Sequence, residues 1–81
     1  MLSKLSDGPV VAGTRRVTKA IESGRAALVY VAQDADLFIK NKLRALCDSH
    51  GVRLMEADSM QALGKACGVA VGAASAALLK D

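Results

Sequence analysis

Aromatic side chains are almost absent from this 81-residue chain, which has no tryptophan, one tyrosine (Tyr30) and one phenylalanine (Phe38). Proteins that bind single-stranded nucleic acid usually stack its bases on aromatic side chains. This scarcity argues against recognition of unstacked bases. A nucleic acid that binds this chain is expected to be recognised as a folded shape, through its phosphates and through polar contacts to base edges.

Cysteine and histidine are also scarce. Cys47 and Cys67 lie far apart and form no CxxC motif, and His50 is the one histidine. We interpret the cysteines as small buried thiols in a reduced cytosol, and we expect no metal site and no cofactor. His50 has no evident nucleophile beside it, and Asp34 and Asp36 are typical of loop and helix-cap chemistry, so the sequence does not favour an enzyme.

Long apolar runs are missing as well. The first seven residues contain none, which argues against a signal peptide. The longest uncharged stretch, residues 66–79, has fourteen residues and is too short to cross a bilayer. A chain of 81 residues with 52% apolar residues predicts a single globular domain, residues 1–81, with a thin core. We therefore expect a cytoplasmic protein.

Positive charge is concentrated in one short segment. Residues 13–25 hold four cations and one anion and so carry a net charge of +3, which equals the formal net charge of the whole chain. The segment begins with Gly13 and a predicted helix, and the N-terminus of a helix attracts anions. Three of the cations are spaced by three or four residues and can reach one ligand: Arg15, Arg16 and Lys19. The segment could be either an anion-binding site or an ordinary solvated helix face.

Hydrophobic periodicity predicts alternating strands and helices. We expect Thr14 to cap the first helix, Asp34 or Asp36 the second, and Ser59 the third. Glycines at 24, 51 and 68 should end these helices. The order predicts an α/β fold, a three-layer α/β/α sandwich with a small mixed, partly parallel sheet. The expected strands are residues 9–12, 26–32, 52–57 and the last part of 69–79, and the expected helices are residues 14–23, 37–49 and 60–67.

A second motif, residues 63–74, places Gly64 and Gly68 around one helical turn and continues as an apolar stretch of small residues. It is either a helix end that leads into a buried strand or a small-residue surface that lies flat against a partner.

Both motifs resemble a known family. The segments GTRRVTKAIESG, ALVYVAQDAD and LCDSHGVRLMEADSMQALGKACGVAVGAA are similar to the ribosomal protein L7Ae/L30e superfamily, and most of all to its short bacterial members. The resemblance covers residues 10–79. It implies an α/β/α sandwich that binds kink-turns, which are sharply bent RNA duplexes with a bulge and tandem sheared G·A pairs.

The resemblance also implies a two-part RNA site. Gly13 and Thr14 would approach the RNA backbone with their N–H groups, and three cations would reach G·A edges and phosphates: Arg15, Arg16 and Lys19. Val69, Ala70 and Val71 would cover the flipped-out bulge nucleotide, with Lys65 near the backbone. Many archaeal and eukaryotic relatives carry Asn-Glu at the positions of Arg15 and Arg16. Arginine only donates hydrogen bonds, and it can grip guanine O6 and N7 with two of them.

The sequence thus supports a non-enzymatic, monomeric protein that stabilises kink-turn RNA, with no DNA or membrane partner. Whether that RNA is ribosomal RNA or a riboswitch stays open. The alternative is a protein-interaction module of a ribonucleoprotein that uses the small-residue surface without touching RNA.

Overall fold

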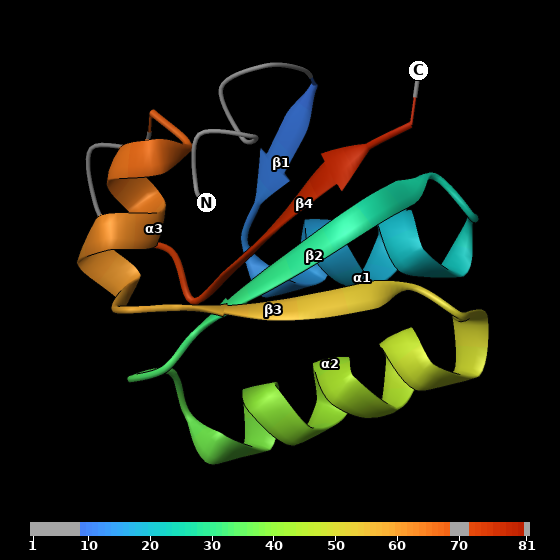
Figure 1. Ribbon diagram of the computed structural model, residues 1–81, viewed down its shortest axis with the longest axis horizontal. Coiled ribbons are helices and arrows are strands. Elements are labelled where there is room, and N and C mark those ends of the chain that lie inside the picture. The colour runs from blue at the N-terminus through green and yellow to red at the C-terminus, as the bar shows by residue number, and fades with distance from the viewer. Residues whose placement is uncertain (1–8, 69–71, 81) are drawn as a thin grey trace.

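The computed structural model describes residues 9–68 and 72–80. Three helices and a four-stranded sheet make up this part of the chain (Figure 1). In chain order the elements are β1 (Val10–Ala12), α1 (Thr14–Glu22), β2 (Ala26–Ala32), α2 (Leu37–His50), β3 (Arg53–Ala57), α3 (Met60–Ala66) and β4 (Ser75–Leu79).

The apolar run of residues 26–32 forms the inner strand β2, as predicted. All of its residues except Ala27 are buried. The strand order is β1-β4-β2-β3. β2 runs parallel to β3, with Leu28 opposite Arg53, and antiparallel to β4, with Val31 opposite Ser75. The sheet is therefore mixed and partly parallel, as expected.

The helices cover the two faces of this sheet. α1 and α2 lie side by side on one face, and α3 packs alone on the other (Figure 1). Each helix points its apolar stripe at the strands, so the buried side chains include Ile21 of α1, Leu43 of α2 and Leu63 of α3. The predicted three-layer α/β/α sandwich is confirmed.

Two of the three predicted helix caps are found. The Asp36 carboxylate accepts the Phe38 N–H at 2.8 Å, and the Ser59 hydroxyl accepts the Ala62 N–H at 3.0 Å. Asp34, the alternative cap for α2, instead accepts the N–H of Met60 at 2.7 Å. It therefore joins the β2–α2 loop to the start of α3.

The prediction that Thr14 caps α1 is wrong. Thr14 is the first helical residue, and the capping position is taken by Gly13, which has no side chain to offer. The Thr14 hydroxyl lies 3.2 Å from the hydroxyl of buried Ser75 in β4. A tertiary partner has thus replaced the local capping bond that the sequence favours.

Gly13 turns the chain from β1 into α1 with φ 99° and ψ 138°. Residues with a Cβ rarely adopt this backbone conformation, and holding one there costs about 1–3 kcal/mol. A Cβ at Gly13 would meet no heavy atom within 4 Å, so crowding adds nothing to that cost.

We expect Gly13→Ala to lower the free energy of unfolding by about 1–3 kcal/mol, because alanine must adopt the strained backbone conformation of Gly13. Urea denaturation should show a lower midpoint with an unchanged slope. An unchanged midpoint would show that α1 can begin with a different backbone turn.

Candidate nucleic-acid interface

The outward face of α1 carries the cations of the basic segment. Val17, Ala20 and Ile21 are buried against the sheet and α2, so the remaining helix surface faces solvent. Arg15 and Lys19 are separated by one helical turn, and Arg16 is three residues from Lys19. All three side chains are exposed, and helical geometry places them on one arc of the helix.

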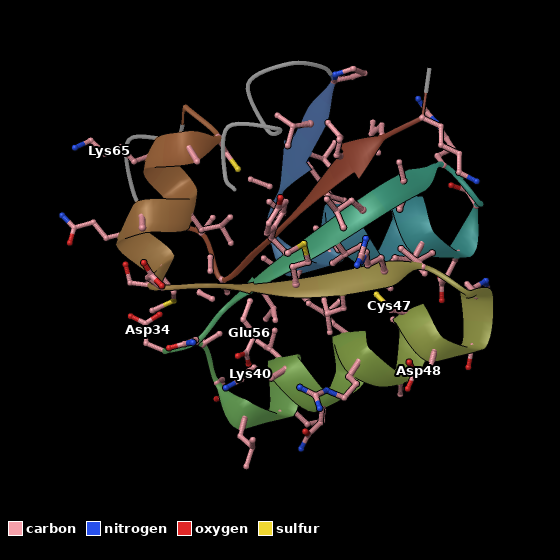
Figure 2. All side chains as sticks on the ribbon, viewed as in Figure 1. Asp34, Lys40, Cys47, Asp48, Glu56 and Lys65 are labelled. Carbon is pink, nitrogen blue, oxygen red and sulfur yellow. The ribbon has the colours of Figure 1, made fainter. Side chains whose placement is uncertain are left out.

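The single anion of α1, Glu22, is three residues from Lys19 and lies on the same exposed side of the helix. Glu22 lines a shallow depression between α1 and α2, together with Thr18 and Lys42. In residues 9–68 and 72–80, Lys40 forms an ion pair with Glu56 at 3.7 Å (Figure 2). Within that part of the chain, no carboxylate is paired with Arg15, Arg16 or Lys19.

The first turn of α1 supplies hydrogen-bond donors beside these cations. A helix leaves its first N–H groups without intrahelical acceptors. In the described residues, the N–H groups of Thr14, Arg15 and Arg16 have no acceptor. The resemblance implies that the Gly13 N–H approaches the RNA backbone. In the structure this N–H instead donates to the Ser75 carbonyl at 2.9 Å, so it is not available to a ligand.

Ser75 joins the start of α1 to the start of β4. It receives the Gly13 N–H on its carbonyl, and its hydroxyl meets that of Thr14. The chain that enters β4 is held from the other side, since the Ala73 N–H donates to the Met60 carbonyl at 3.0 Å. A Cβ at Gly72 would lie 3.2 Å from the Met60 backbone. The chain just before β4 is therefore fixed between α1 and α3.

The predicted second half of the site is described only in part. Val69, Ala70 and Val71 lie outside the described residues. Lys65 is exposed in the last turn of α3, on the face of the sheet opposite α1, and its side chain points away from the sheet (Figure 2). The structure thus gathers the cations of α1 on one arc, whereas Lys65 comes from another layer.

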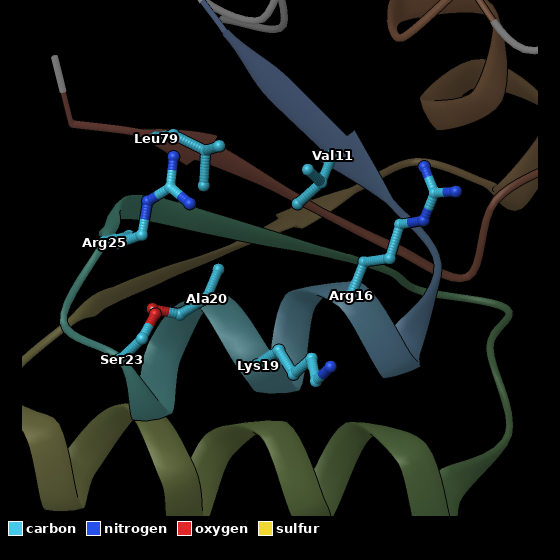
Figure 3. Close-up of a pocket in the computed structure, with 7 residues that line it drawn as sticks. All are labelled: Val11, Arg16, Lys19, Ala20, Ser23, Arg25 and Leu79. Carbon is cyan, nitrogen blue, oxygen red and sulfur yellow. The ribbon is translucent and has the colours of Figure 1, made fainter.

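A pocket of about 390 Å³ opens between α1 and the strands β1 and β4 (Figure 3). Arg16 and Lys19 extend from α1 at its rim, and Arg25 follows the end of the same helix. The remaining lining residues are Val11, Ala20, Ser23 and Leu79.

Comparison with known proteins identifies the family. The model of the ribosomal protein L7Ae/L30e/S12e/Gadd45 family matches residues 2–81. The chain belongs to this family. This L7Ae-family protein is 45% identical over 76 residues to a protein of Geobacillus thermodenitrificans named "RNA-binding protein", covering 94% of this chain and 93% of the relative. It is 43% identical over 76 residues to RNA-binding protein YbxF of Geobacillus stearothermophilus, with the same coverage of 94% and 93%.

Solved structures agree with this assignment. The Giardia lamblia 15.5kD RNA binding protein superposes with a TM-score of 0.87 at 34% identity, covering 99% of this chain and 69% of that chain. A protein with unknown function from Bacillus halodurans superposes with a TM-score of 0.86 at 26% identity, covering 98% of this chain and 83% of that chain. The L7Ae-family fold is therefore shared by proteins of distant organisms.

The cysteines of this L7Ae-family protein are free thiols. Burial raises the pKa of the Cys47 thiol, and the neighbouring charge of Asp48 raises it further. Burial also raises the pKa of Cys67. Both thiols are thus protonated and weakly nucleophilic near neutral pH. The described residues contain no group of three potential metal ligands. They also contain no helix with the length and apolar character needed to span a bilayer.

Two residues around the candidate site of this L7Ae-family protein were not singled out from the sequence. Arg25 belongs to the basic segment, and its charge is the signal in the sequence that points to it. Ser75 is the one polar residue in the apolar run 69–79, and a polar residue in such a run indicates a buried hydrogen-bond partner. That partner, Thr14, is 61 residues away and could not be assigned from the sequence.

Proposed function

We propose that this L7Ae-family protein acts as a single RNA-binding domain over residues 1–81, without catalysis, and stabilises kink-turn RNA. The observation that carries the proposal is the start of α1, where exposed cations without a carboxylate partner lie beside N–H groups without an acceptor in the described residues. The RNA-binding names of relatives that match nearly the whole chain support it.

The site residues would divide the contacts by their chemistry. Arg15 and Arg16 can each donate two parallel hydrogen bonds, either to guanine O6 and N7 or to a phosphate. Lys19 offers a compact charge suited to a phosphate. The free N–H groups at Thr14 and beyond would donate hydrogen bonds to oxygen atoms of the RNA backbone, and Gly13 would contribute by its turn rather than by its N–H group. Lys65, Val69, Ala70 and Val71 would complete the proposed site, as the resemblance to the family implies.

The mechanism is a shift of population. Kink-turn RNA exchanges between an open and a bent form, and a protein that binds only the bent form raises its share. The effect is set by the difference in affinity for the two forms, not by the total affinity.

The test is a titration of kink-turn RNA and of a straight duplex of equal length at several salt concentrations. We expect tighter binding to the kink-turn at every salt concentration, with a linear fall of log affinity against log salt. Equal affinities for the two RNAs would contradict kink-turn recognition. Absence of binding to either RNA, with crosslinks from the segment before β4 to protein, would favour the protein-interaction alternative.

Lys19→Ala tests the basic face within this titration. If Lys19 contacts a phosphate, binding should weaken for both RNAs and the salt slope should fall by about one unit. Lys42→Ala is a suitable control, since Lys42 is an exposed lysine of the neighbouring helix α2. A slope that Lys19→Ala leaves unchanged would remove Lys19 from the interface.

A further inference from the structure

The pocket beside α1 has an apolar floor and a cationic rim (Figure 3). Its floor is formed by side chains from three elements, Val11 of β1, Ala20 of α1 and Leu79 of β4. Arg16 stands at one end and Arg25 at the other, with the floor between them (Figure 3). We call this feature the basic groove.

The charge of the basic groove defines the kind of occupant. Three of its seven lining residues are cations and none is acidic. In the described residues, none of the three is paired with a carboxylate. Because the lining carries three positive charges and no negative one, the groove is complementary to an anion.

The groove holds Arg25 in a defined position. The Arg25 N–H donates to the Ala20 carbonyl at 2.9 Å, and its carbonyl accepts the Lys80 N–H at 2.7 Å. The backbone below the guanidinium is thus fixed to both α1 and the chain end that follows β4. A fixed backbone lowers the entropic cost of a contact made by this side chain.

The basic groove is continuous with the proposed kink-turn site. Arg16 and Lys19 belong to both, and the groove continues along α1 and past its end to Arg25. The eight residues from Arg16 to Ser23 span about 10 Å along the helix axis, which exceeds the roughly 3.4 Å axial spacing of successive phosphates on one strand of a duplex. A strand that leaves the start of α1 in this direction would present several phosphates to the groove.

We propose that the basic groove binds the sugar–phosphate backbone of a duplex stem that flanks the kink. Arg25 contacts a phosphate remote from the kink, and the ribose faces of the same strand lie on the apolar floor. This proposal rests on the proposed function, because the strand in the groove belongs to the RNA that is bound at the start of α1. That continuity favours an RNA stem over a separate acidic peptide.

The test compares two kink-turn RNAs that differ only in stem length, one with both stems minimal and one with each stem longer by a helical turn. Wild-type protein, Arg25→Gln and the control Arg53→Gln are titrated with both RNAs at several salt concentrations. Arg53 is exposed on β3, at the sheet edge opposite β1, so both variants lose the same charge. Thermal unfolding of each variant checks that the fold is kept.

We expect Arg25→Gln to weaken binding of the long-stem RNA by about 5–10-fold and to lower its salt slope by about one unit. The short-stem RNA should bind wild type and Arg25→Gln equally, and Arg53→Gln should match wild type on both. Equal affinity and slope of Arg25→Gln and wild type on the long-stem RNA would overturn the groove assignment while leaving kink-turn binding intact. A wild-type protein that binds the kink-turn no better than a straight duplex would instead overturn the proposed function itself.

Discussion

The double variant Arg15→Glu/Lys19→Glu should lose RNA binding almost completely while keeping its fold. Each cation would take part in at least one charge-assisted hydrogen bond, which contributes about 1.5–3 kcal/mol. Loss of two such contacts amounts to about 3–6 kcal/mol, or roughly a 10²–10⁴-fold weaker affinity. The new carboxylates would also repel the phosphates, so the upper part of this range is expected. Gel-shift or anisotropy titration at moderate salt measures the loss.

The fold should tolerate this change because both positions are exposed. A glutamate at Arg15, near the helix start, is favoured by the helix dipole by about 0.3–1 kcal/mol, and one at Lys19, near the helix end, is disfavoured by a similar amount. The 15/19 pair stays a like-charge pair, whereas position 19 gains an attractive neighbour in Arg16 and a repulsive one in Glu22, so these changes offset one another. Unfolding free energy should therefore stay within about 1 kcal/mol of wild type.

The matched control is Arg44→Glu/Arg53→Glu. Both double variants exchange two cations for two anions, a change of −4 that takes the net charge from +3 to −1. Arg44 and Arg53 are exposed on α2 and β3. Their reversal should cost far less affinity, through the long-range field alone. Equal losses in the two variants would mean that RNA senses the net charge of the protein and not the face of α1.

Leu63→Ala should cause the largest loss of stability. Leu63 is fully buried where α3 packs on the sheet, and α3 is alone on that face. Removal of a buried leucine side chain costs about 2–5 kcal/mol. A chain of this length has a total stability of about 4–12 kcal/mol, so the variant would lose a large share of it. Urea denaturation should show a much lower midpoint.

The effect of Leu63→Ala on RNA affinity follows from the contacts of α3. The Met60 carbonyl holds the Ala73 N–H, so a loosened α3 releases the chain just before β4. RNA affinity should therefore fall together with stability. Gln61→Ala, on the exposed side of the same helix, should change stability by no more than about 0.5 kcal/mol. A cost below about 1 kcal/mol for Leu63→Ala would show that α3 does not depend on this side chain for its packing.

Local chemistry in the sequence predicted most of the fold. The run of residues 26–32 predicts an inner strand, because it is short and lacks a polar face. Asp36 and Ser59 begin their helices because their oxygen atoms accept N–H groups two or three residues ahead. Gly51 ends α2 in the left-handed conformation that glycine adopts without strain. Each of these features is decided within a few residues.

The features that the sequence did not predict share one cause. Thr14 and Asp34 both have oxygen atoms that could cap a nearby helix, and each instead meets a partner from a distant segment. The insertion of β4 between β1 and β2 likewise depends on contacts across the whole chain. For the candidate site, the sequence located the cations of α1, but it did not show that Arg25 shares a groove with them. Such contacts follow from the packed tertiary structure and leave no pattern along the chain.

The link between Ser75 and the start of α1 has a consequence for biosynthesis. β1 lies at the edge of the sheet, and in the described chain its one neighbouring strand is β4. The Ser75 and Thr14 hydroxyls are 61 residues apart, so this contact closes a loop of most of the chain. Closure of long loops comes late in folding. Because the N-terminal segments of a chain leave the ribosome first, α1 would be exposed to RNA before its turn is fixed. The start of α1 should therefore take its folded form in the nascent chain only after β4 has emerged.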